Sequence, residues 1–470
     1  MIWTLYDILQ ATGGRLLYGA PDACFDGVAI DSRTISEKQL FVAIRGENHD
    51  GHTFIDQVAD RGVRGMLVTD DTETNPSHLR WKQRGLTCVA VADTVRALGG
   101  LAACQRNRFD IPVVAITGSN GKTTTRQMTT HVMAQRFNTL STMGNFNNEI
   151  GLPLTLFNLT AQHQAAVLEV GMNHAGELTR LGAICRPTIG MITTVGPCHL
   201  EFLGSLEGVA RAKEELIAQI DPSGTAVLNL DDPRVADMGQ RAGRPVLYFG
   251  TTAKADIRAE HIREAADGVT FELKLPGEST QVVLATPGRF MVINALAAAS
   301  AGYLNGLSAA EIKAGLGSFA PTKGRLKVVP TNLGVNIIDD TYNANPASMA
   351  AAIDTLTHLR RDRPGMIILG DMLELGDLSE TLHRQLGAMA AASGASRLYA
   401  YGPQARAVQE GAKEAGLPPS AIFTGGKEDI SADAIRNLHC GDWVLVKGSR
   451  GMAMETIVEA IRLWADSLHR

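Results

Sequence analysis

One short segment of this sequence has the residue types and spacing needed to hold the phosphates of a nucleotide. The residues from Thr117 to Thr124 read Thr-Gly-Ser-Asn-Gly-Lys-Thr-Thr, and they lie between the apolar run Val113–Ile116 and a predicted helix. In such a strand–turn–helix unit, backbone N–H groups and the positive end of the helix face phosphate oxygens. The residues expected to bind ATP are Gly118, Ser119, Asn120, Gly121, Lys122, Thr123 and Thr124.

Within this segment the side chains have separate roles. Lys122 is expected to reach the terminal phosphoryl oxygens, and the Thr123 hydroxyl is expected to bind magnesium. The strict pattern G-x-x-x-x-G-K-[ST] is not met, because its first glycine falls on Ile116, and the variant here is G-x-x-G-K-T. The segment predicts nucleotide binding, but the acceptor of the phosphoryl group must be decided by other residues.

Two further side chains follow predicted strands and could bind a metal. A magnesium ion that bridges phosphates prefers oxygen ligands, so an acidic residue is expected at the end of a neighbouring strand. Glu169 is the next-to-last residue of the run Ala166–Val170, and His199 follows the next run, Ile189–Val195. We interpret Glu169 and His199 as candidate metal or phosphate ligands with a catalytic role.

The elements around these residues predict three α/β domains. At 470 residues and 45% hydrophobic composition, the chain is long enough for about three cores of ~150 residues each. The middle part alternates buried-looking strands with helices, as a parallel sheet covered on both faces requires. Its expected strands are 113–117, 166–170, 189–195 and 226–230, followed by an antiparallel pair, 269–275 and 281–285, and a helix over 294–300.

The outer parts complete this plan. Residues 1–85 predict a small N-terminal α/β module, and residues 86–322 predict the central P-loop ATPase-like domain with its parallel sheet. Residues 323–470 predict a C-terminal Rossmann-like domain, because strands at 335–338, 366–369, 398–401 and 443–446 alternate with helical stretches. Ligand chemistry belongs at the carboxyl ends of such strands.

Composition narrows the possible functions. The net charge of −5 provides no global positive field for nucleic acid or anionic lipid, so we expect neither partner. The six cysteines lack a C-x-x-C pair, which favours reduced thiols and a cytoplasmic setting. The start of the chain has no basic leader, and no apolar run approaches the ~18 residues of a membrane span. We expect a cytoplasmic, monomeric protein.

With these elements in place, the phosphate segment resembles that of the Mur ligases of peptidoglycan synthesis, whose hallmark is T-G-[ST]-N-G-K-T-T. The similarity extends over the whole chain, and its finer signatures resemble the member that adds a dipeptide. These signatures are Ile30-Asp-Ser-Arg33, Leu40–His52, Gly144-Asn-Phe-Asn-Asn-Glu-Ile-Gly151, Leu168-Glu-Val-Gly-Met172, Ala210-Arg-Ala-Lys-Glu214, Asp339–Pro346, Leu369–Gly376 and Val446-Lys-Gly-Ser-Arg450.

The resemblance implies both a domain plan and a reaction. The first domain would bind the UDP-sugar end of the substrate, the central domain would bind ATP, and the C-terminal domain would close over ATP and bind the incoming dipeptide. ATP would phosphorylate the terminal carboxylate of UDP-MurNAc-tripeptide, and D-alanyl-D-alanine would attack the acyl phosphate. The products would be UDP-MurNAc-pentapeptide, ADP and phosphate.

The resemblance also implies roles for individual residues. Lys213 matches a lysine that becomes a carbamate and helps to hold a second Mg²⁺, whereas its own sequence context is that of a solvated helix lysine. Asn294 matches the adenine-side asparagine, and Arg325 and Asp340 match residues that reach phosphate and ribose. The chain departs from the family pattern at Phe290-Met291, where relatives commonly have His-Asn, so no polar adenine contact is expected there.

The substrate candidates form three groups along the chain. Turn formation competes as an explanation for most of them, and the third group offers hydrogen bonds and cations suited to a dipeptide or its carboxylate. The candidates are Ser32, Arg33, Asn48, Asp50 and His52 for the uridine diphosphate, Asn147 and Asn148 for the sugar or peptide, and Tyr342, Asn343, Asn345, Lys447 and Arg450 for the peptide substrates.

Three alternatives remain open at this point. The first is another Mur-type ligase, although the D-N-P-R signature of the diamino-acid-adding enzyme is absent. The second is a ligase similar to folylpolyglutamate synthase, which should lack the Asn343-Ala-Asn-Pro346 run and the long first domain. The third is a P-loop NTPase that acts as a switch without ligation. The sequence does not tell whether the tripeptide ends in diaminopimelate or lysine.

Overall fold

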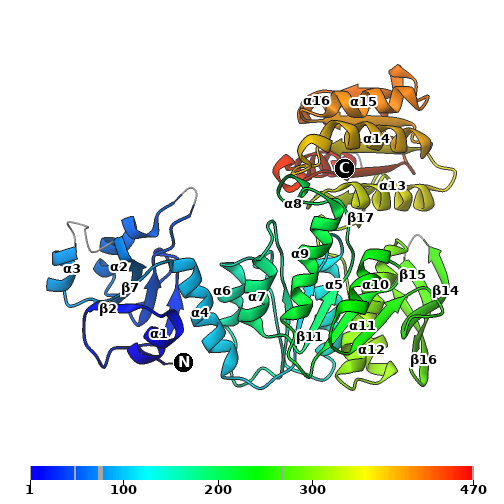
Figure 1. The fold of residues 1–470 in the computed structure, drawn as a ribbon. Helices are drawn as coiled ribbons and strands as arrows, with labels where there is room; N and C mark the ends of the chain where they lie inside the picture. Colours follow the sequence, from blue (N-terminus) through cyan, green and yellow to red (C-terminus); the bar gives the residue numbers. More distant parts are fainter. Residues whose placement is uncertain (1, 47–48, 72–77, 266–267, 468–470) are drawn as a thin grey trace.

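The computed structural model describes residues 2–46, 49–71, 78–265 and 268–467. They form an N-terminal domain, a central domain beside it, and a C-terminal domain above the central one in the view of Figure 1. Each domain is built on a mainly parallel sheet. The predicted α/β fold class with three domains is confirmed.

The N-terminal domain contains a five-stranded sheet with the order β2-β7-β6-β5-β4. Strands β4 to β7 are parallel, and β2 is antiparallel to β7. Because β7 pairs with β6, this sheet continues past residue 85, where the sequence suggested a boundary. The elements are α1 (Leu5–Thr12), β2 (Arg15–Tyr18), β4 (Gly27–Ala29), β5 (Gln39–Val42), α2 (Ile55–Asp60), β6 (Gly65–Thr69), α3 (His78–Gln83), β7 (Thr87–Val91) and α4 (Thr94–Asn107), with a small ribbon of β1 (Trp3–Thr4) and β3 (Cys24–Phe25).

The central domain is built on a nine-stranded sheet with the order β16-β15-β14-β13-β12-β11-β8-β10-β9. Strand β8 lies between β10 and β11 and is parallel to both, so the carboxyl ends of these three strands converge at one edge. The strands are β8 (Val113–Thr117), β9 (Thr139–Ser141), β10 (Ala165–Glu169), β11 (Ile189–Ile192), β12 (Thr225–Asn229), β13 (Val246–Gly250), β14 (Ile257–Ala265), β15 (Gly268–Leu275) and β16 (Glu278–Leu284).

Helices cover both faces of this sheet, as the alternating side chains of β8 show. Val114 and Ile116 belong to one buried core, and Val113 and Ala115 belong to the core on the opposite face. Successive side chains of a strand point to opposite faces, so a strand that is apolar throughout is covered on both sides. The helices are α5 (Lys122–Met133), α6 (Gly151–Leu156), α7 (Glu177–Cys185), α8 (Leu200–Leu203), α9 (Leu206–Ala218), α10 (Pro233–Met238), α11 (Phe290–Leu304) and α12 (Ala309–Gly317).

The C-terminal domain contains a six-stranded sheet with the order β17-β18-β22-β19-β20-β21, in which only β17 is antiparallel. Helices α13 to α17 pack around it (Figure 1). The elements are β17 (Lys327–Pro330), β18 (Asn336–Asp340), α13 (Pro346–Arg360), β19 (Gly365–Gly370), η4 (Gly376–Leu378), α14 (Ser379–Ala392), β20 (Arg397–Tyr401), α15 (Ala405–Glu414), β21 (Ile422–Thr424), α16 (Lys427–Asn437), β22 (Trp443–Lys447), η6 (Arg450–Met452) and α17 (Glu455–Ser467).

Most of the strands expected from sequence are present within one or two residues of their predicted ends. The exceptions are β11, which ends at Ile192, and β16, which begins at Glu278. The predicted antiparallel pair forms β15 and β16, which extend the central sheet through β14. Strands such as β9 and β21 were not anticipated, because three residues are too few to show a period. None of the described helices combines the length and apolar character needed to cross a lipid bilayer.

Candidate active site

The phosphate segment forms the tight turn between β8 and α5. Gly118 and Gly121 have φ values of 151° and 81°, which are rarely accessible to other residues. A Cβ atom at Gly121 would also collide with Asn294 Oδ1. Lys122 opens α5, and its Nζ donates a hydrogen bond to the Gly118 carbonyl at 2.7 Å. The turn therefore requires glycine at both positions, and it places the start of a twelve-residue helix at the converging strand ends.

Residues after β11 hold this turn in place. The Ser119 and Asn120 backbone N–H groups donate to the Thr194 carbonyl (2.8 Å) and hydroxyl (3.1 Å). The Ser119 hydroxyl accepts from Gly196 N at 2.8 Å and donates to Gly196 O at 3.0 Å. The residues that follow the neighbouring strand β11 thus fix the conformation of this turn. The sequence motif of the phosphate segment does not reveal these contacts.

Glu169 ends β10 beside this turn and is only 2% exposed. Its Oε1 accepts a hydrogen bond from Asn147 Nδ2 at 2.8 Å, and its Oε2 lies 3.5 Å from Arg126 Nε. Among the described residues, Oε2 has no hydrogen-bond donor. A buried carboxylate oxygen without a donor is costly unless a cation or a ligand completes its surroundings.

Lys213 lies on α9 and is 2% exposed, so it is not the solvated lysine that its sequence context favours. The pKa of Lys213 is lowered to about 8, mainly because the side chain is buried; Cys198 opposes this decrease, and the nearby positive charge of Lys122 contributes to it. No hydrogen bond or ion pair of its ammonium is found within the described part of the chain. A larger fraction of this amine is therefore neutral near pH 7 than for an ordinary lysine.

The C-terminal domain brings polar side chains to the same place. Arg325 Nη2 donates to Thr123 Oγ1 at 2.9 Å, and its guanidinium lies 3.9 Å from the centre of the Tyr342 ring. Asn345 Nδ2 donates to Asn120 Oδ1 at 2.8 Å. These contacts dock the C-terminal domain directly on the phosphate turn.

A buried ion pair lies behind these contacts. Lys447, at the end of β22, donates to Asp340 Oδ2 at 2.5 Å and to the Asn343 carbonyl at 2.9 Å. Asp340 Oδ1 also accepts from Leu326 N at 3.1 Å. The charges of Lys447 and Asp340 therefore pair with each other inside the C-terminal domain, and their hydrogen bonds hold the loop that carries Asn343.

One cavity of about 720 Å³ joins these groups. Asn294 lines it beside Phe290 and Met291, whose apolar side chains offer no strong hydrogen-bond donor. The predicted residues that line the cavity are Ser119, Asn120, Gly121, Lys122, Thr123, Thr124, Asn147, Asn148, Glu169, His199, Asn294, Arg325, Asp340, Tyr342, Asn343, Asn345 and Lys447.

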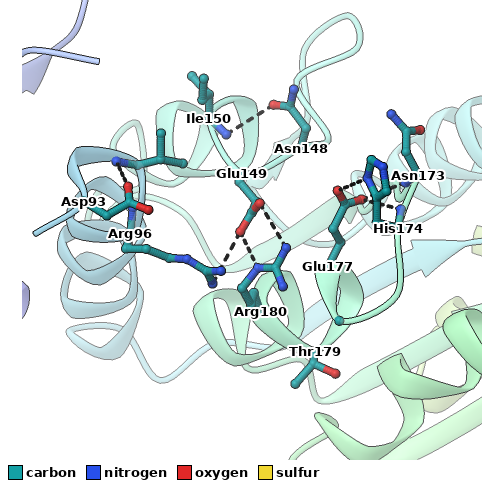
Figure 2. Close-up of polar contacts among 12 residues, drawn as sticks. Asp93, Arg96, Asn148, Glu149, Ile150, Asn173, His174, Glu177, Thr179 and Arg180 are labelled. Atoms are coloured by element: carbon teal, nitrogen blue, oxygen red, sulfur yellow. Dashed lines mark hydrogen bonds and ion pairs between the residues drawn. The ribbon is translucent and has the colours of Figure 1, made fainter. Parts of the chain in front are cut away.

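Two charged residues that sequence reasoning missed, Glu149 and Glu177, also line the cavity. Figure 2 shows Glu149 between the guanidinium groups of Arg96 and Arg180. Glu149 Oε1 lies 3.6 Å from Arg96 Nη1 and 2.5 Å from Arg180 Nε. Glu177 accepts from Asn173 N at 2.7 Å and from His174 Nδ1 at 3.1 Å (Figure 2). Glu149 directly follows Asn147 and Asn148, which were predicted substrate residues. This adjacency in the sequence could have indicated that Glu149 also lines the site.

Three consecutive family models match this chain. They are the Mur ligase family catalytic domain over residues 25–106, the Mur ligase middle domain over 116–302, and the Mur ligase glutamate ligase domain over 324–450. The UDP-N-acetylmuramoyl-tripeptide–D-alanyl-D-alanine ligase of Escherichia coli (strain K12) is 37% identical over 465 residues, which cover 98% of each chain. The chain belongs to the Mur ligase family.

Solved structures of Mur ligases share the whole fold. A crystal structure of MurF from Acinetobacter baumannii has a TM-score of 0.90 and 31% identity, and covers 98% of this chain and 99% of that one. The MurF ligase of Thermotoga maritima, crystallised with ADP, has a TM-score of 0.83 and 27% identity, with 94% and 98% coverage. The similarity therefore extends across all three domains of this Mur ligase.

Several predicted residues of this Mur ligase do not line the cavity. Lys213 is buried outside the lining, and Arg450 pairs with Glu455 at 3.1 Å. Asp50 and His52 bind each other at 2.6 Å, and His52 Nε2 accepts from Thr69 N, so both are used within the first domain. Outside the lining are Gly118, Ser32, Arg33, Asp50, His52, Lys213 and Arg450, and Asn48 lies outside the described residues.

Proposed function

We propose that this Mur ligase joins D-alanyl-D-alanine to UDP-MurNAc-tripeptide at the expense of ATP, giving UDP-MurNAc-pentapeptide, ADP and phosphate for peptidoglycan synthesis. Relatives that bear this activity in their names match nearly the full chain. The structural observation that supports the proposal most directly is the single cavity, in which the phosphate turn, Glu169 and the Tyr342–Asn345 loop face the same space. A carboxylate, a triphosphate and an amine must meet for this reaction, and a shared cavity allows that.

The first step transfers a phosphoryl group to a carboxylate. A carboxylate oxygen of the tripeptide attacks the γ-phosphorus, the bond to the β–γ bridging oxygen breaks, and ADP leaves. Both reactants are anionic, so cations must offset their repulsion in the transition state. Lys122 and Arg325 both line the cavity at the phosphate turn and are suited to this role. The N-terminus of α5 adds N–H groups that point at the phosphates.

The second step forms the amide. The free amine of the dipeptide attacks the acyl carbon, the carbon–oxygen bond to phosphate breaks, and the nitrogen loses a proton. An acyl phosphate hydrolyses in water, so the site must exclude solvent. The docking contacts of Arg325 and Asn345 support a role of the C-terminal domain in covering this site.

The residues present fit the magnesium that such ligases use. Thr123 offers a hydroxyl, Glu169 offers the Oε2 atom that has no hydrogen-bond donor among the described residues, and His199 lines the same cavity. We propose that these three hold Mg²⁺, which would neutralise phosphate charge and orient the γ-phosphoryl group.

We also propose that Lys213 becomes a carbamate. Its neutral amine would attack carbon dioxide, forming a nitrogen–carbon bond and releasing one proton, and the resulting anion would serve as a second metal ligand. The burial of Lys213 and its pKa of about 8 support this step, because an ammonium cannot react with carbon dioxide.

The domains would divide the substrates. We propose that residues 1–85 bind the UDP end, that residues 86–322 bind ATP, and that residues 323–470 bind the dipeptide. The charged end of the cavity around Glu149 would then face the peptide of the UDP-linked substrate (Figure 2). We further expect the enzyme to act in the cytoplasm, where ATP is available.

Substrate-dependent ADP release tests the proposed function. We expect release only when ATP, UDP-MurNAc-tripeptide and D-alanyl-D-alanine are all present, and we expect Lys122→Ala to abolish it. Parallel assays with diaminopimelate-containing and lysine-containing tripeptides would define the third residue, and glutamate with a folate acceptor would test the folate-ligase alternative. Phosphate release that is insensitive to both peptide substrates would show that the chain is an NTPase without ligase activity.

A further inference from the structure

A direct contact links the metal-site histidine of the central domain to an acidic residue of the C-terminal domain. His199 Nδ1 lies 2.5 Å from Glu374 Oε2, although the two residues are 175 positions apart in the sequence. Glu374 follows β19 and precedes η4, and His199 is the N-cap of α8. Figure 1 shows α8 directly below the C-terminal domain.

Both residues have an unusual backbone conformation. The φ angles are 52° for His199 and 63° for Glu374, and they belong to the few positive values among the described residues other than glycine. Such left-handed conformations are strained for residues other than glycine and persist where the surrounding structure enforces them. Two such residues that meet side chain to side chain indicate that both loops are shaped for this contact.

The loops around the pair also pack together. A Cβ atom on Gly376 would lie 3.4 Å from Glu201 Cα, which is ordinary contact distance. The beginning of η4 therefore rests on the beginning of α8, and the His199–Glu374 contact is one part of a domain interface. The His199 side chain is 21% exposed and that of Glu374 is 44% exposed, so the contact lies at the margin of this interface.

The contact between His199 Nδ1 and Glu374 affects the other ring nitrogen of His199, Nε2. A histidine that donates its Nδ1–H to a carboxylate keeps the lone pair of Nε2 for another partner. The carboxylate fixes the tautomer and the orientation of the ring. His199 lines the cavity with Glu169, and its Nε2 has no hydrogen-bond partner within the described ranges.

We propose that Glu374 is a positioning residue for the metal site. The C-terminal domain brings the Glu374 carboxylate to His199 when this domain docks on the central domain. The inference rests on the proposed function, because it takes His199 as a magnesium ligand. Its consequence is that divalent-cation affinity and domain docking are coupled: the cation binds more tightly when the C-terminal domain is in place, and the docked arrangement is favoured when the cation is bound.

Manganese binding, measured by electron paramagnetic resonance on the intact protein with ADP, tests this proposal without turnover. We expect Glu374→Ala to weaken Mn²⁺ binding by about 10- to 100-fold, the usual effect of removing a carboxylate behind a metal-bound histidine. Glu374→Gln can still accept the Nδ1–H bond and should retain most of the affinity. Asp377→Ala, at an exposed acidic residue of η4, is the matched control and should bind Mn²⁺ like the wild type.

The outcomes separate this inference from the proposed function. If His199→Ala weakens Mn²⁺ binding but Glu374→Ala does not, the positioning role is wrong and the ligand role of His199 stands. If His199→Ala has no effect, both assignments fail, whereas ligase activity is judged independently by ADP release. If Asp377→Ala lowers the Mn²⁺ affinity as much as Glu374→Ala does, the effect is due to general surface charge and the proposal is overturned. Circular dichroism and thermal unfolding of each variant would show that it is folded.

A second readout follows the tautomer itself. In protein labelled with ¹⁵N-histidine, the wild type should show the Nδ1–H form of His199, and Glu374→Ala should show a mixture or the opposite tautomer. An unchanged tautomer in Glu374→Ala would contradict the proposal even if manganese affinity fell.

Discussion

Arg126 Nε lies 3.5 Å from Glu169 Oε2, and both side chains are almost completely buried. Arg126 Nη1 also donates to Ser141 Oγ at 3.2 Å and to the Thr142 carbonyl. The guanidinium thus ties the carboxylate at the end of β10 to the end of β9. The carboxylate proposed to hold magnesium is kept in place by a cation from the helix that follows the phosphate turn.

We therefore predict that Arg126→Met destabilises the protein by about 3–5 kcal/mol, the usual cost of leaving one partner of a buried ion pair unpaired. Urea unfolding would measure the change. Arg234→Met is a matched control, because Arg234 pairs with Glu207 at the exposed surface, and it should cost at most about 1 kcal/mol. Combining Arg126→Met with Glu169→Gln should recover part of the loss. Equal effects of the two arginine substitutions would contradict the prediction.

Gly121→Ala should weaken ADP binding by at least about 10- to 100-fold, or about 1.4–2.8 kcal/mol. The substitution strains a residue with a φ of 81° and drives a methyl group into Asn294 Oδ1, so the phosphate turn must shift. Isothermal titration with ADP would measure the loss. Gly243→Ala has a φ of 62° but no atom within 4 Å of its new Cβ, so it should lower stability by only about 1 kcal/mol and leave ADP affinity unchanged.

Formation of the Lys213 carbamate should depend on pH in a defined direction. With a pKa of about 8, about a tenth of the amine is neutral at pH 7, compared with about 0.03% for a lysine at the ordinary 10.5. Protonation blocks reaction with carbon dioxide, so carbamate formation should increase as pH rises from 6 through about 8. A carbamate signal from ¹³C-bicarbonate in nuclear magnetic resonance spectra would report it.

Two variants of Lys213 complete this test. Lys213→Ala should lack the carbamate signal, and its activity should be partly restored by short carboxylic acids that occupy the vacated space. A wild-type signal that persists in Lys213→Ala, or full activity of that variant without added acid, would refute the assigned role.

Asn345 combines two roles that substitutions can separate. Its Oδ1 accepts from Ser348 N at 2.9 Å and caps α13, while its Nδ2 donates to Asn120 at 2.8 Å across the domain interface. Asn345→Ser keeps a capping oxygen and should leave stability nearly unchanged, but it should raise the KM for ATP because the bridge is lost. Asn345→Ala should raise KM similarly and also lower stability by about 1 kcal/mol. Thermal unfolding and steady-state kinetics would distinguish these effects, and an unchanged KM in both variants would exclude the bridging role.

The sequence by itself determined the local units of this protein. The apolar run of β8, the two glycines and Lys122 at the start of α5 specify a strand, a turn and a helix within a dozen residues, and β8 has the predicted bounds. Glu169 was likewise expected at a strand end, because apolar runs and the polar residues that follow them are local patterns. The resemblance to Mur ligases added the roles of residues that no local pattern could assign.

Only the tertiary structure decided which of these residues share a site. Lys213 follows a pattern typical of an exposed helix position, yet the packing of α9 buries it. The contacts of His199 with Glu374 and of Asp340 with Lys447 join residues more than a hundred positions apart. Burial and such pairings depend on how whole elements pack against one another, and neither hydrophobic period nor motif spacing contains that information.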